Sequence, residues 1–401
     1  MKYVIVLGDG MADEPLEELG GLTPLAYAKT VHLDALSAVS ETGMVHTIPG
    51  GMKPGSDTAN LSVLGYDPAR YYSGRSPLEA LSIGVPMKDT DIALRCNLVT
   101  VSQEDGIPFE ERTILDHSAD EISTADAAVL LEAVKRELEN DMYRFYVGTS
   151  YRHCVIWDHG TVVDLTPPHD ILGRVIGAYL PAERTFYEMM KKSYDILSRH
   201  PLNAERIRQG LRPANCCWFW GAGTRPMLSD FMAEHGKKGV MISAVDLLKG
   251  IAVGAGMDNI EVEGANGGLH TNYEGKAAAA VKALTQDGYD FAYIHIEAPD
   301  EMGHQGSAEK KVQAIEYIDA RVIKPLKEGL DSAGEPYRLL VLPDHPTPVR
   351  VRTHTGSDVP YLLYDSSRPA SGGTLYNETA ASKTGVRVEK GHMLIRRLFE
   401  E

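Results

Sequence analysis

Three aspartates and three histidines in this 401-residue chain stand just after apolar stretches or in the loop that follows one. They are Asp9, Asp300, His304, Asp344, His345 and His354. Singly, each has an ordinary explanation, because an aspartate after a strand often forms a turn and a loop histidine is often a surface residue. Together they are a set of mutually repelling carboxylates and imidazoles that bound cations would stabilise. Such ligands suit zinc, manganese or similar ions, and a pair of ions is a recurrent device for phosphoryl chemistry.

Two of these residues have the spacing of a shared ligand site. Asp300 and His304 lie four residues apart in PDEMGH. If this turn is helical, both side chains lie on one face and can close on a single ion.

The stretch PGSDTAN at 54–60 offers a hydroxyl that could act as a nucleophile. Its plain interpretation is a helix start, because Ser and Asp after a glycine are preferred caps, and Gly65 fits the helix end. The same geometry would place Ser56 at the positive end of a helix dipole. Beside a metal ion, that hydroxyl could ionise near neutral pH and attack phosphorus.

The elements that must position these residues follow an α/β pattern. Apolar, β-branched runs predict strands of a largely parallel sheet, and helical stretches such as 307–330 fall between several of them. In open sheets of this kind, ligands bind beyond the carboxyl ends of the strands. The predicted strands are 3–8, 43–48, 216–221, 239–244, 291–298, 337–343 and 359–365.

The middle of the chain has a different character. Strands of mixed polarity and long helices, one of them opened by Ser123, predict an α+β domain between residues 90 and 211. The α/β pattern precedes and follows it. We therefore expect a discontinuous core domain, 1–89 with 212–401, and an inserted domain, 90–211.

Composition limits the partners and the compartment. With 43% hydrophobic and 24% charged residues the chain is typical of a globular protein, and its formal net charge of -16 disfavours nucleic acid and anionic membranes. Its four cysteines show no metal or disulfide spacing, which favours reduced thiols. No stretch has membrane-spanning length, and the N-terminus lacks a signal cleavage site. These features predict a cytoplasmic protein, and they leave a homo-oligomer open.

The order of the motifs carries a family resemblance. Asp-Gly near the N-terminus, PGSDTAN, APDEMGH, PDH and THT resemble the alkaline phosphatase superfamily. More closely, GDGMAD, PGSDTANLSVLGYDP, YYSGRSPLEA and KGHMLIRR look like the archaeal-type cofactor-independent phosphoglycerate mutases, over essentially the whole chain. This resemblance implies an alkaline-phosphatase-like core with an inserted domain, 90–211, that binds substrate and acts as a lid.

The resemblance also implies roles for individual residues. Ser56 would be the position that becomes phosphorylated. Asp9, Ser56, Asp344 and His345 would hold one metal ion, and Asp300, His304 and His354 the other. In related mutases, arginines and a histidine bind the phosphate and carboxylate of the substrate. The candidates here are Arg75, Arg95, Arg152, His153 and Lys249, with Arg70 and His169 as further alternatives; a surface ion pair or a capped turn is the structural alternative for each.

The implied reaction interconverts 3-phosphoglycerate and 2-phosphoglycerate through a phosphoserine. It would use two divalent ions, Mn²⁺ or Zn²⁺ with Mg²⁺ as an alternative, and no 2,3-bisphosphoglycerate. A nearby clade with a proposed homoserine kinase activity keeps the same site and changes the substrate, and the chain lacks a GxxxxGK[ST] loop for ATP. A phosphatase or phosphonate hydrolase, or a metal-binding protein without catalysis, are the remaining alternatives.

Overall fold

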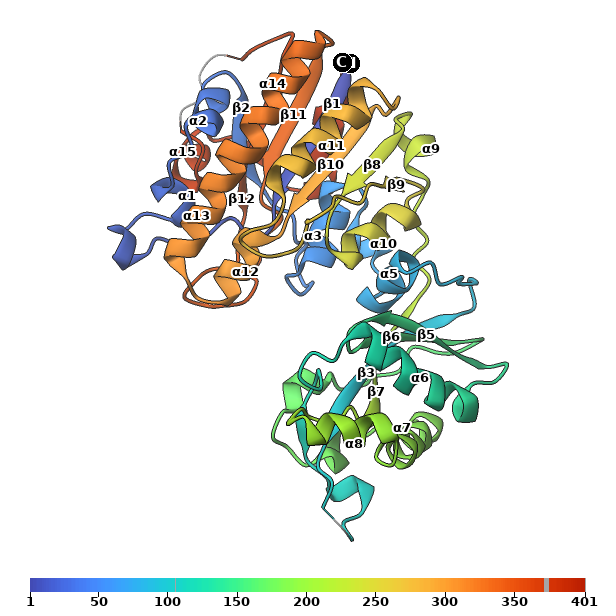
Figure 1. Ribbon diagram of the computed structural model, residues 1–401. Coiled ribbons are helices and arrows are strands. Elements are labelled where there is room, and N and C mark those ends of the chain that lie inside the picture. Colours follow the sequence, from blue (N-terminus) through green and yellow to red (C-terminus); the bar gives the residue numbers. More distant parts are fainter. Residues whose placement is uncertain (105, 371–374, 401) are drawn as a thin grey trace. The chain divides into compact units, whose positions relative to one another are not determined.

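The chain forms two compact units. The computed structural model describes residues 1–104, 106–370 and 375–400. Unit 1 joins Met1–Tyr72 with Met227–Glu401, and unit 2 is the continuous segment Ser73–Pro226 (Figure 1). Unit 2 therefore extends beyond 90–211 at both ends, because a helix before that segment and a strand after it pack with its sheet.

Unit 1 is built on a large, mostly parallel sheet, as the apolar runs predict. Strand β12 is antiparallel to its neighbours β11 and β2, and the other neighbouring pairs are parallel. Strand β1 lies between β11 and β10, so the two strands beside it come from the last third of the chain. In spatial order the strands are β13 (Arg387–Val388), β2 (Glu41–Val45), β12 (Val359–Asp365), β11 (Tyr337–Leu342), β1 (Lys2–Gly8), β10 (Phe291–Ile296), β8 (Gly239–Ile242) and β9 (Asp258–Asn259).

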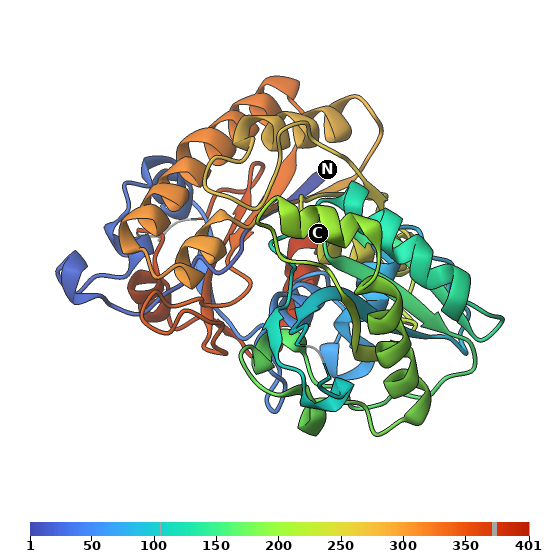
Figure 2. The same ribbon diagram turned by 60° about the horizontal axis from the view of Figure 1, so that its bottom comes forward.

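Three long helices cover one face of this sheet. They are α11 (Tyr273–Thr285), α13 (Ala308–Ile318) and α14 (Lys324–Ala333); α13 and α14 follow one another in one line, and α11 lies beside them in Figures 1 and 2. A short π-helical segment, η5 (Asp319–Ile323), joins α13 to α14, so the helix predicted over 307–330 forms with one irregular turn. Its periodic apolar residues Val312, Ile315, Ile318, Val322, Leu326 and Leu330 are all buried.

The other face of the sheet carries the elements closest to the predicted chemistry. Strand residues alternate between faces, so Ala292, Ile294 and Ile296 pack under the three helices while Tyr293 and His295 point to the opposite side. The remaining helices of unit 1 are η1 (Glu17–Leu19), α1 (Pro24–Tyr27), α2 (Val31–Ser37), α3 (Ser56–Val63), α4 (Pro68–Tyr71), α9 (Phe231–His235), α10 (Asp246–Gly254), α12 (Ala298–His304), α15 (Glu378–Lys383), η6 (Gly391–Met393) and α16 (Leu394–Phe399).

Unit 2 is an α+β unit around an antiparallel sheet. Its strands are β3 (Ile92–Val101), β4 (Ile114–Asp116), β5 (Tyr143–Thr149), β6 (Arg152–Trp157) and β7 (Cys216–Thr224). Its helices are α5 (Arg75–Ser82), η2 (Phe109–Glu111), α6 (Thr124–Leu138), η3 (Pro168–Ile171), η4 (Ile176–Tyr179), α7 (Arg184–Leu197) and α8 (Pro201–Arg208). As predicted, Ser123 caps α6 by accepting the amide hydrogen of Asp126.

One strand prediction is wrong. The run 216–221 is expected in the parallel sheet, but β7 pairs antiparallel with β3 inside unit 2. An apolar run indicates that a strand is buried on both faces but does not specify the strand with which it pairs. The residues 216–221 alone therefore do not show to which of the two sheets this strand belongs.

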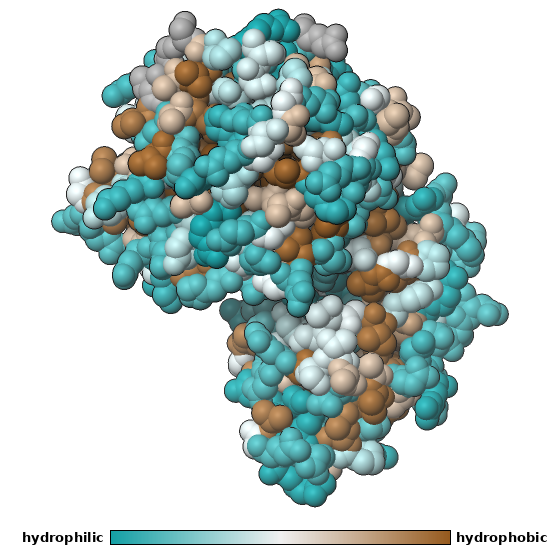
Figure 3. Space-filling model, turned by 45° about the horizontal axis from the view of Figure 1, so that its top comes forward, coloured by the Kyte–Doolittle hydropathy of each residue, from teal (hydrophilic) through white to brown (hydrophobic). Residues whose placement is uncertain are grey.

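The surface and the thiols agree with the composition. Figure 3 shows hydrophobic residues interspersed among hydrophilic ones. Among the described residues, no helix is both long and apolar enough to cross a membrane. The cysteines Cys96, Cys154, Cys216 and Cys217 are all buried and free, as their spacing predicts.

Candidate metal centre

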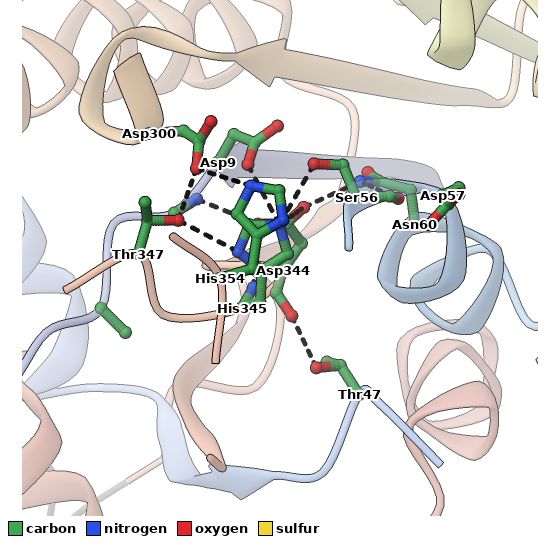
Figure 4. Close-up of polar contacts among 12 residues, drawn as sticks. Asp9, Thr47, Ser56, Asp57, Asn60, Asp300, Asp344, His345, Thr347 and His354 are labelled. Carbon is green, nitrogen blue, oxygen red and sulfur yellow. Dashed lines mark hydrogen bonds and ion pairs between the residues drawn. The ribbon is translucent and has the colours of Figure 1, made fainter. Parts of the chain in front are cut away.

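The predicted donor residues meet at one edge of the sheet of unit 1. Strands β1, β10 and β11 are neighbours and run parallel, so their carboxyl ends share that edge. Asp9 follows β1, α12 follows β10, and Asp344 and His345 follow β11. Figure 4 shows how Asp9, Asp300, Asp344, His345 and His354 converge from these separate segments toward Ser56.

One set of donors, which we call the inner group, consists of Asp9, Asp344 and His345. Nε2 of His345 lies 3.1 Å from Oγ of Ser56, 3.4 Å from Oδ2 of Asp344 and 3.6 Å from Oδ1 of Asp9. The side chains of the group are at most 3% exposed. The nucleophile candidate therefore faces a buried imidazole with two carboxylates beside it.

The other set, the outer group, consists of Asp300, His304 and His354. Nε2 of His304 lies 3.0 Å from Nε2 of His354 and 3.2 Å from Oδ2 of Asp300, and Oδ1 of Asp300 lies 3.5 Å from Nε2 of His354. The two imidazoles are 34% and 22% exposed, so this group is more open to solvent than the inner one. The i, i+4 spacing of Asp300 and His304 lies within α12, as predicted.

The two groups adjoin each other through one carboxylate. Ligand atoms of Asp300, His304 and His354 all lie within 4.8 Å of one another, and so do those of Asp9, Asp300 and His345. Because the carboxylate of Asp300 lies this close to Asp9 and His345 as well as to His304 and His354, it stands between the inner and the outer group.

The electrostatics of the inner group fit a bound cation. Burial, reinforced by the charges of Asp344 and Asp300, raises the pKa of Asp9 well above its usual value. Oδ1 of Asp9 is buried and accepts no hydrogen bond from any described residue. Burial lowers the pKa of His345, so its imidazole is held neutral, as a metal ligand must be. A cation beside Oδ1 of Asp9 and Nε2 of His345 would offset both the repulsion and the missing partner.

In the outer group, the hydrogen bonds of His304 orient its imidazole as a metal ligand would be oriented. Nδ1 of His304 lies 3.0 Å from the carbonyl oxygen of Arg352, which can only accept a hydrogen bond. This contact places a hydrogen on Nδ1 and aims Nε2 at Asp300, the usual arrangement of a metal-ligating histidine. The hydrogen bond to Asp300 raises the pKa of His304 to about 9, so a proton occupies the position that a metal ion would take.

The carboxylate of Asp300 is charged in this setting. Burial acts to raise its pKa, but hydrogen bonds with His304 and His354 hold the pKa well below its usual range. Thr347 adds a hydrogen bond from its hydroxyl to Oδ1 of Asp300. The glycine of the Asp-Gly motif makes room for this packing, because a Cβ on Gly10 would lie 2.5 Å from Oδ1 of Asp300, and its φ of +58° is itself unfavourable for other residues.

Ser56 begins helix α3, but it is not the cap. The cap position is Gly55, without a side-chain hydrogen bond, and Ser56 is the first helical residue. Asp57 instead accepts the amide hydrogen of Thr58 through Oδ1. The hydroxyl of Ser56 is thereby left to face His345, and the predicted stop at Gly65, with φ of +92°, is confirmed.

Some of the predicted substrate residues lie together in unit 2. Arg75 and Arg95 both bind the carboxylate of Glu79, with Nε to oxygen distances of 2.9 and 2.6 Å. The Arg95 guanidinium stacks on Trp220 at 4.4 Å, and the ring of His169 contacts the same indole at 5.2 Å. Two cations share one carboxylate, so this cluster keeps a net positive charge. Burial lowers the pKa of Arg95, and the positive charge of the nearby Arg152 acts in the same direction.

The remaining candidates stand apart from that cluster. His153 pairs across the sheet with Cys96, so it shares the face packed under α6 and α7, whereas Arg95 and Arg152 lie on the other face, against which α5 packs. Lys249 is in unit 1, on α10, and pairs with Glu261 at 2.7 Å. Arg70, on α4, lies over the ring of Tyr71.

The structure adds residues that sequence reasoning did not select. Asn60, His295 and Thr347 form hydrogen bonds to predicted metal ligands, and Tyr293 donates a hydrogen bond to Asn60. Near the arginine cluster, Trp220 stacks with Arg95 and donates to Asn97, and His117 contacts the ring of His169. Most of them sit inside apolar strands or helices. Only the polar residues interrupting the strand FAYIHI could have signalled a role.

Carboxylates and imidazoles gathered at the carboxyl edge of a parallel sheet are the arrangement expected of an enzyme active site. Residues 38–203 match the family model described as 2,3-bisphosphoglycerate-independent phosphoglycerate mutase. An enzyme of that name from Methanosarcina mazei is 47% identical over 374 residues, which cover 92% of each chain.

Solved structures agree with this match. A Pyrococcus horikoshii protein is 28% identical with a TM-score of 0.82, over 100% of this chain and 96% of that one. The cofactor-independent phosphoglycerate mutase from Thermoplasma acidophilum is 26% identical with a TM-score of 0.67, over 100% and 99%. The chain belongs to the family of 2,3-bisphosphoglycerate-independent phosphoglycerate mutases. This confirms the resemblance and implies a small phosphorylated substrate; family and donor set together indicate divalent metal ions.

Proposed function

We propose that this chain interconverts 3-phosphoglycerate and 2-phosphoglycerate through a phosphoserine formed on Ser56. The observation that carries the proposal is the position of the Ser56 hydroxyl. It lies at the positive end of α3, 3.1 Å from Nε2 of His345, at the border of the inner group. A hydroxyl in this setting is suited to attack phosphorus.

The two donor groups would hold two divalent ions. The inner group with Ser56 would hold one, and the outer group the other; Mn²⁺ or Zn²⁺ suit these ligands, with Mg²⁺ as the alternative. When bound, such ions activate a hydroxyl and neutralise charge on phosphoryl oxygens. The reaction then needs no 2,3-bisphosphoglycerate, because Ser56 itself carries the phosphoryl group.

The transfer balances in two steps. Oγ of Ser56 gives up its proton and forms a bond to phosphorus while the bond between phosphorus and the glycerate oxygen breaks, and that oxygen takes up a proton. The other hydroxyl of the glycerate then gives up its proton and attacks phosphoserine, the bond between phosphorus and Oγ breaks, and Oγ of Ser56 takes up a proton. The positive end of α3 stabilises the phosphoryl oxygens in both steps.

The substrate's other anionic groups need cations. We propose that Arg75, Arg95 and Arg152 bind them, with His169 on the same indole as Arg95, because guanidinium groups bind carboxylate and phosphate in two-point contacts. His153 and Lys249 stay predictions for this role. The four buried free thiols support a reducing, cytoplasmic location.

The test is whether Ser56 becomes phosphorylated. The Mn²⁺-loaded enzyme is given 3-phosphoglycerate, quenched in acid, and its peptides are examined by mass spectrometry, with mutase activity followed by an enolase-coupled assay. Ser56→Ala should abolish both the phosphopeptide and the activity. The matched control is Ser62→Ala, a buried hydroxyl of the same helix without a hydrogen-bond partner among the described residues, which should keep both.

Two results would overturn the proposal. Full activity of Ser56→Ala would exclude the nucleophile. Activity with homoserine and ATP but not with 3-phosphoglycerate would assign a different substrate to the same site.

A further inference from the structure

Two residues of strand β10 reach the inner group from behind. Tyr293 and His295 are two positions apart, so they share one face of the strand, and neither is exposed to solvent. Each belongs to a series of hydrogen bonds that reaches an aspartate of the inner group: His295 contacts Asp9 directly, and Tyr293 reaches Asp344 through Asn60.

The chain through His295 ends on Asp9. Nε2 of His295 lies 2.9 Å from Oδ2 of Asp9, and its Nδ1 lies 3.2 Å from Oγ of Ser243. Oγ of Ser243 also accepts the amide hydrogen of Val245 at 3.0 Å, which leaves its own hydrogen for Nδ1. Beside a bound cation Asp9 is a carboxylate and can only accept, so Nε2 of His295 carries a hydrogen and donates it to Oδ2.

The chain through Tyr293 ends on Asp344. The Tyr293 hydroxyl donates to Oδ1 of Asn60 at 2.6 Å, and Nδ2 of Asn60 donates to Oδ2 of Asp344 at 2.9 Å and to the carbonyl oxygen of Ser56 at 2.8 Å. The carboxylate again fixes the direction, because only the amide nitrogen of Asn60 can donate to it. Asn60 and Asp344 are fully buried, as Tyr293 is.

Both chains act on the orientation of a carboxylate. The terminal torsion of an aspartate is soft, so a free carboxylate can rotate. With Oδ2 of Asp9 tied to His295, Oδ1 is directed toward Nε2 of His345 and has no other partner among the described residues. Asp344 is fixed more fully, because its Oδ1 accepts the amide hydrogens of Gly10 at 3.0 Å and His345 at 2.9 Å.

We propose that His295 and Tyr293 are positioning residues that orient Asp9 and Asp344 for the metal ion of the inner group, and that Ser243 fixes the imidazole of His295 for this task. The inference rests on the metal-binding role proposed above for Asp9 and Asp344. Strand β10 would then have two functions. Its side chains orient ligands of the inner group, and its carboxyl end is followed by α12, which contains Asp300 and His304 of the outer group.

Within the described part of the chain, no strand residue supports the outer group in this way. Its histidine His304 is oriented by a loop carbonyl, that of Arg352, and the carboxylate of Asp300 by the hydroxyl of Thr347. Loss of the β10 contacts should therefore weaken the binding of the metal ion in the inner group and leave binding in the outer group unchanged.

The test measures metal binding rather than activity. Mn²⁺ is titrated into metal-free protein by calorimetry, and the bound equivalents are counted by elemental analysis. Loss of a hydrogen bond behind a metal ligand typically costs about 10- to 100-fold in affinity. We expect that loss at one of two sites in His295→Leu and Tyr293→Phe, with the second site unchanged, and a smaller loss in Ser243→Ala.

Two further variants separate positioning from simple packing. His295→Gln keeps an N–H donor near the place of Nε2 and should recover most of the lost affinity. Tyr337→Phe removes the hydroxyl of an equally buried tyrosine of the same sheet, which donates to Asp331 away from the site, and should bind Mn²⁺ as the unaltered chain does.

Two results would contradict the positioning role, and a third would contradict the metal assignment on which it rests. Wild-type affinity at both sites in His295→Leu and Tyr293→Phe would overturn the inference. Equal loss in His295→Gln and His295→Leu would also overturn it, because packing would then explain the effect. If Asp9→Asn itself binds two equivalents with unchanged affinity, the underlying metal assignment fails instead. The melting temperature of each metal-free variant shows whether it has folded, and the conservative Tyr293→Phe and Ser243→Ala keep the test decisive if His295→Leu has not.

Discussion

The two units gather opposite charges in different ways. Unit 1 collects carboxylates and imidazoles at the ends of three adjacent strands, where main-chain amides and buried side chains hold them. Unit 2 collects guanidinium groups on the face of its sheet against which α5 packs, held by one carboxylate and an indole. The first arrangement would suit cations and the second an anion. In a chain of net charge -16, this local concentration of arginines would attract the anionic substrate that we propose.

The strongest test of this comparison removes one charge from the inner group. In Asp344→Asn, we expect mutase activity to fall by about 10³-fold and one Mn²⁺ equivalent to be lost, because metal stabilisation of the transferring phosphoryl group is worth several kcal/mol. Enolase-coupled kinetics and elemental analysis check this. Asp287→Asn, at an exposed ion pair with Lys282, is the control. Two retained equivalents with normal activity would remove Asp344 from the centre.

A second test concerns Lys311, a buried lysine that connects two of the loops next to the predicted metal ligands of unit 1. The Nζ of Lys311 is fully buried and donates to Asp13 at 2.7 Å and to the carbonyl oxygens of Ala12 and Thr347 at 3.1 and 2.8 Å. These contacts join the loop after β1 to the loop after β11. Lys311→Met leaves Asp13 as a buried, uncompensated charge, so unit 1 should lose about 3 kcal/mol of stability.

The tryptophans allow that loss to be assigned to one unit. All three, Trp157, Trp218 and Trp220, lie in unit 2. In urea, Lys311→Met should shift the circular dichroism transition of unit 1 and leave the tryptophan fluorescence transition unmoved. The double variant Lys311→Met/Asp13→Asn should recover part of the loss. An equal shift of both signals would show that the two units unfold together.

On the basic side, the expected effect is on substrate affinity. Arg95→Met should raise KM for 3-phosphoglycerate about 30-fold with bound metal unchanged, because a charge-assisted hydrogen bond contributes about 2 kcal/mol. Arg184→Met, an exposed arginine of the same unit, is the matched control for charge. If KM stays constant while kcat falls, Arg95 acts on the reaction and not on binding.

The smallest effect concerns pH and the stability of unit 2. Burial lowers the pKa of His153 from 6.5 to about 4, so below pH 6.5 the unfolded state takes up a proton that the folded state does not. Stability therefore falls as the pH drops through this window, by about 1 kcal/mol between pH 7 and 5.5. Urea transitions followed by tryptophan fluorescence should show this decrease in the unaltered chain and not in His153→Gln. Parallel pH curves would mean that His153 is not held neutral.

What the sequence could and could not predict follows the same division. The convergence of the donors of unit 1 was predictable because they follow apolar strands directly or lie in the turn or loop after one, and parallel strands bring their carboxyl ends to one edge. The face on which His153 lies was not, because neighbouring residues of a strand point to opposite faces and the register is set by the pairing with β3. Tyr293 contacts Asn60 and His295 contacts Asp9, both more than 200 residues away, so the role of these two residues depends on tertiary contacts.

The order of strands in unit 1 has a consequence for biosynthesis. Strand β1 is made first, yet its two neighbours, β10 and β11, are made only in the last third of the chain. Unit 2 is continuous in sequence and needs none of these strands. On the ribosome, an apolar strand must therefore wait unpaired while nearly 300 residues are added, and the continuous unit can fold before the interrupted one. The candidate metal centre, which needs β1, β10 and β11 together, is then among the last features to assemble.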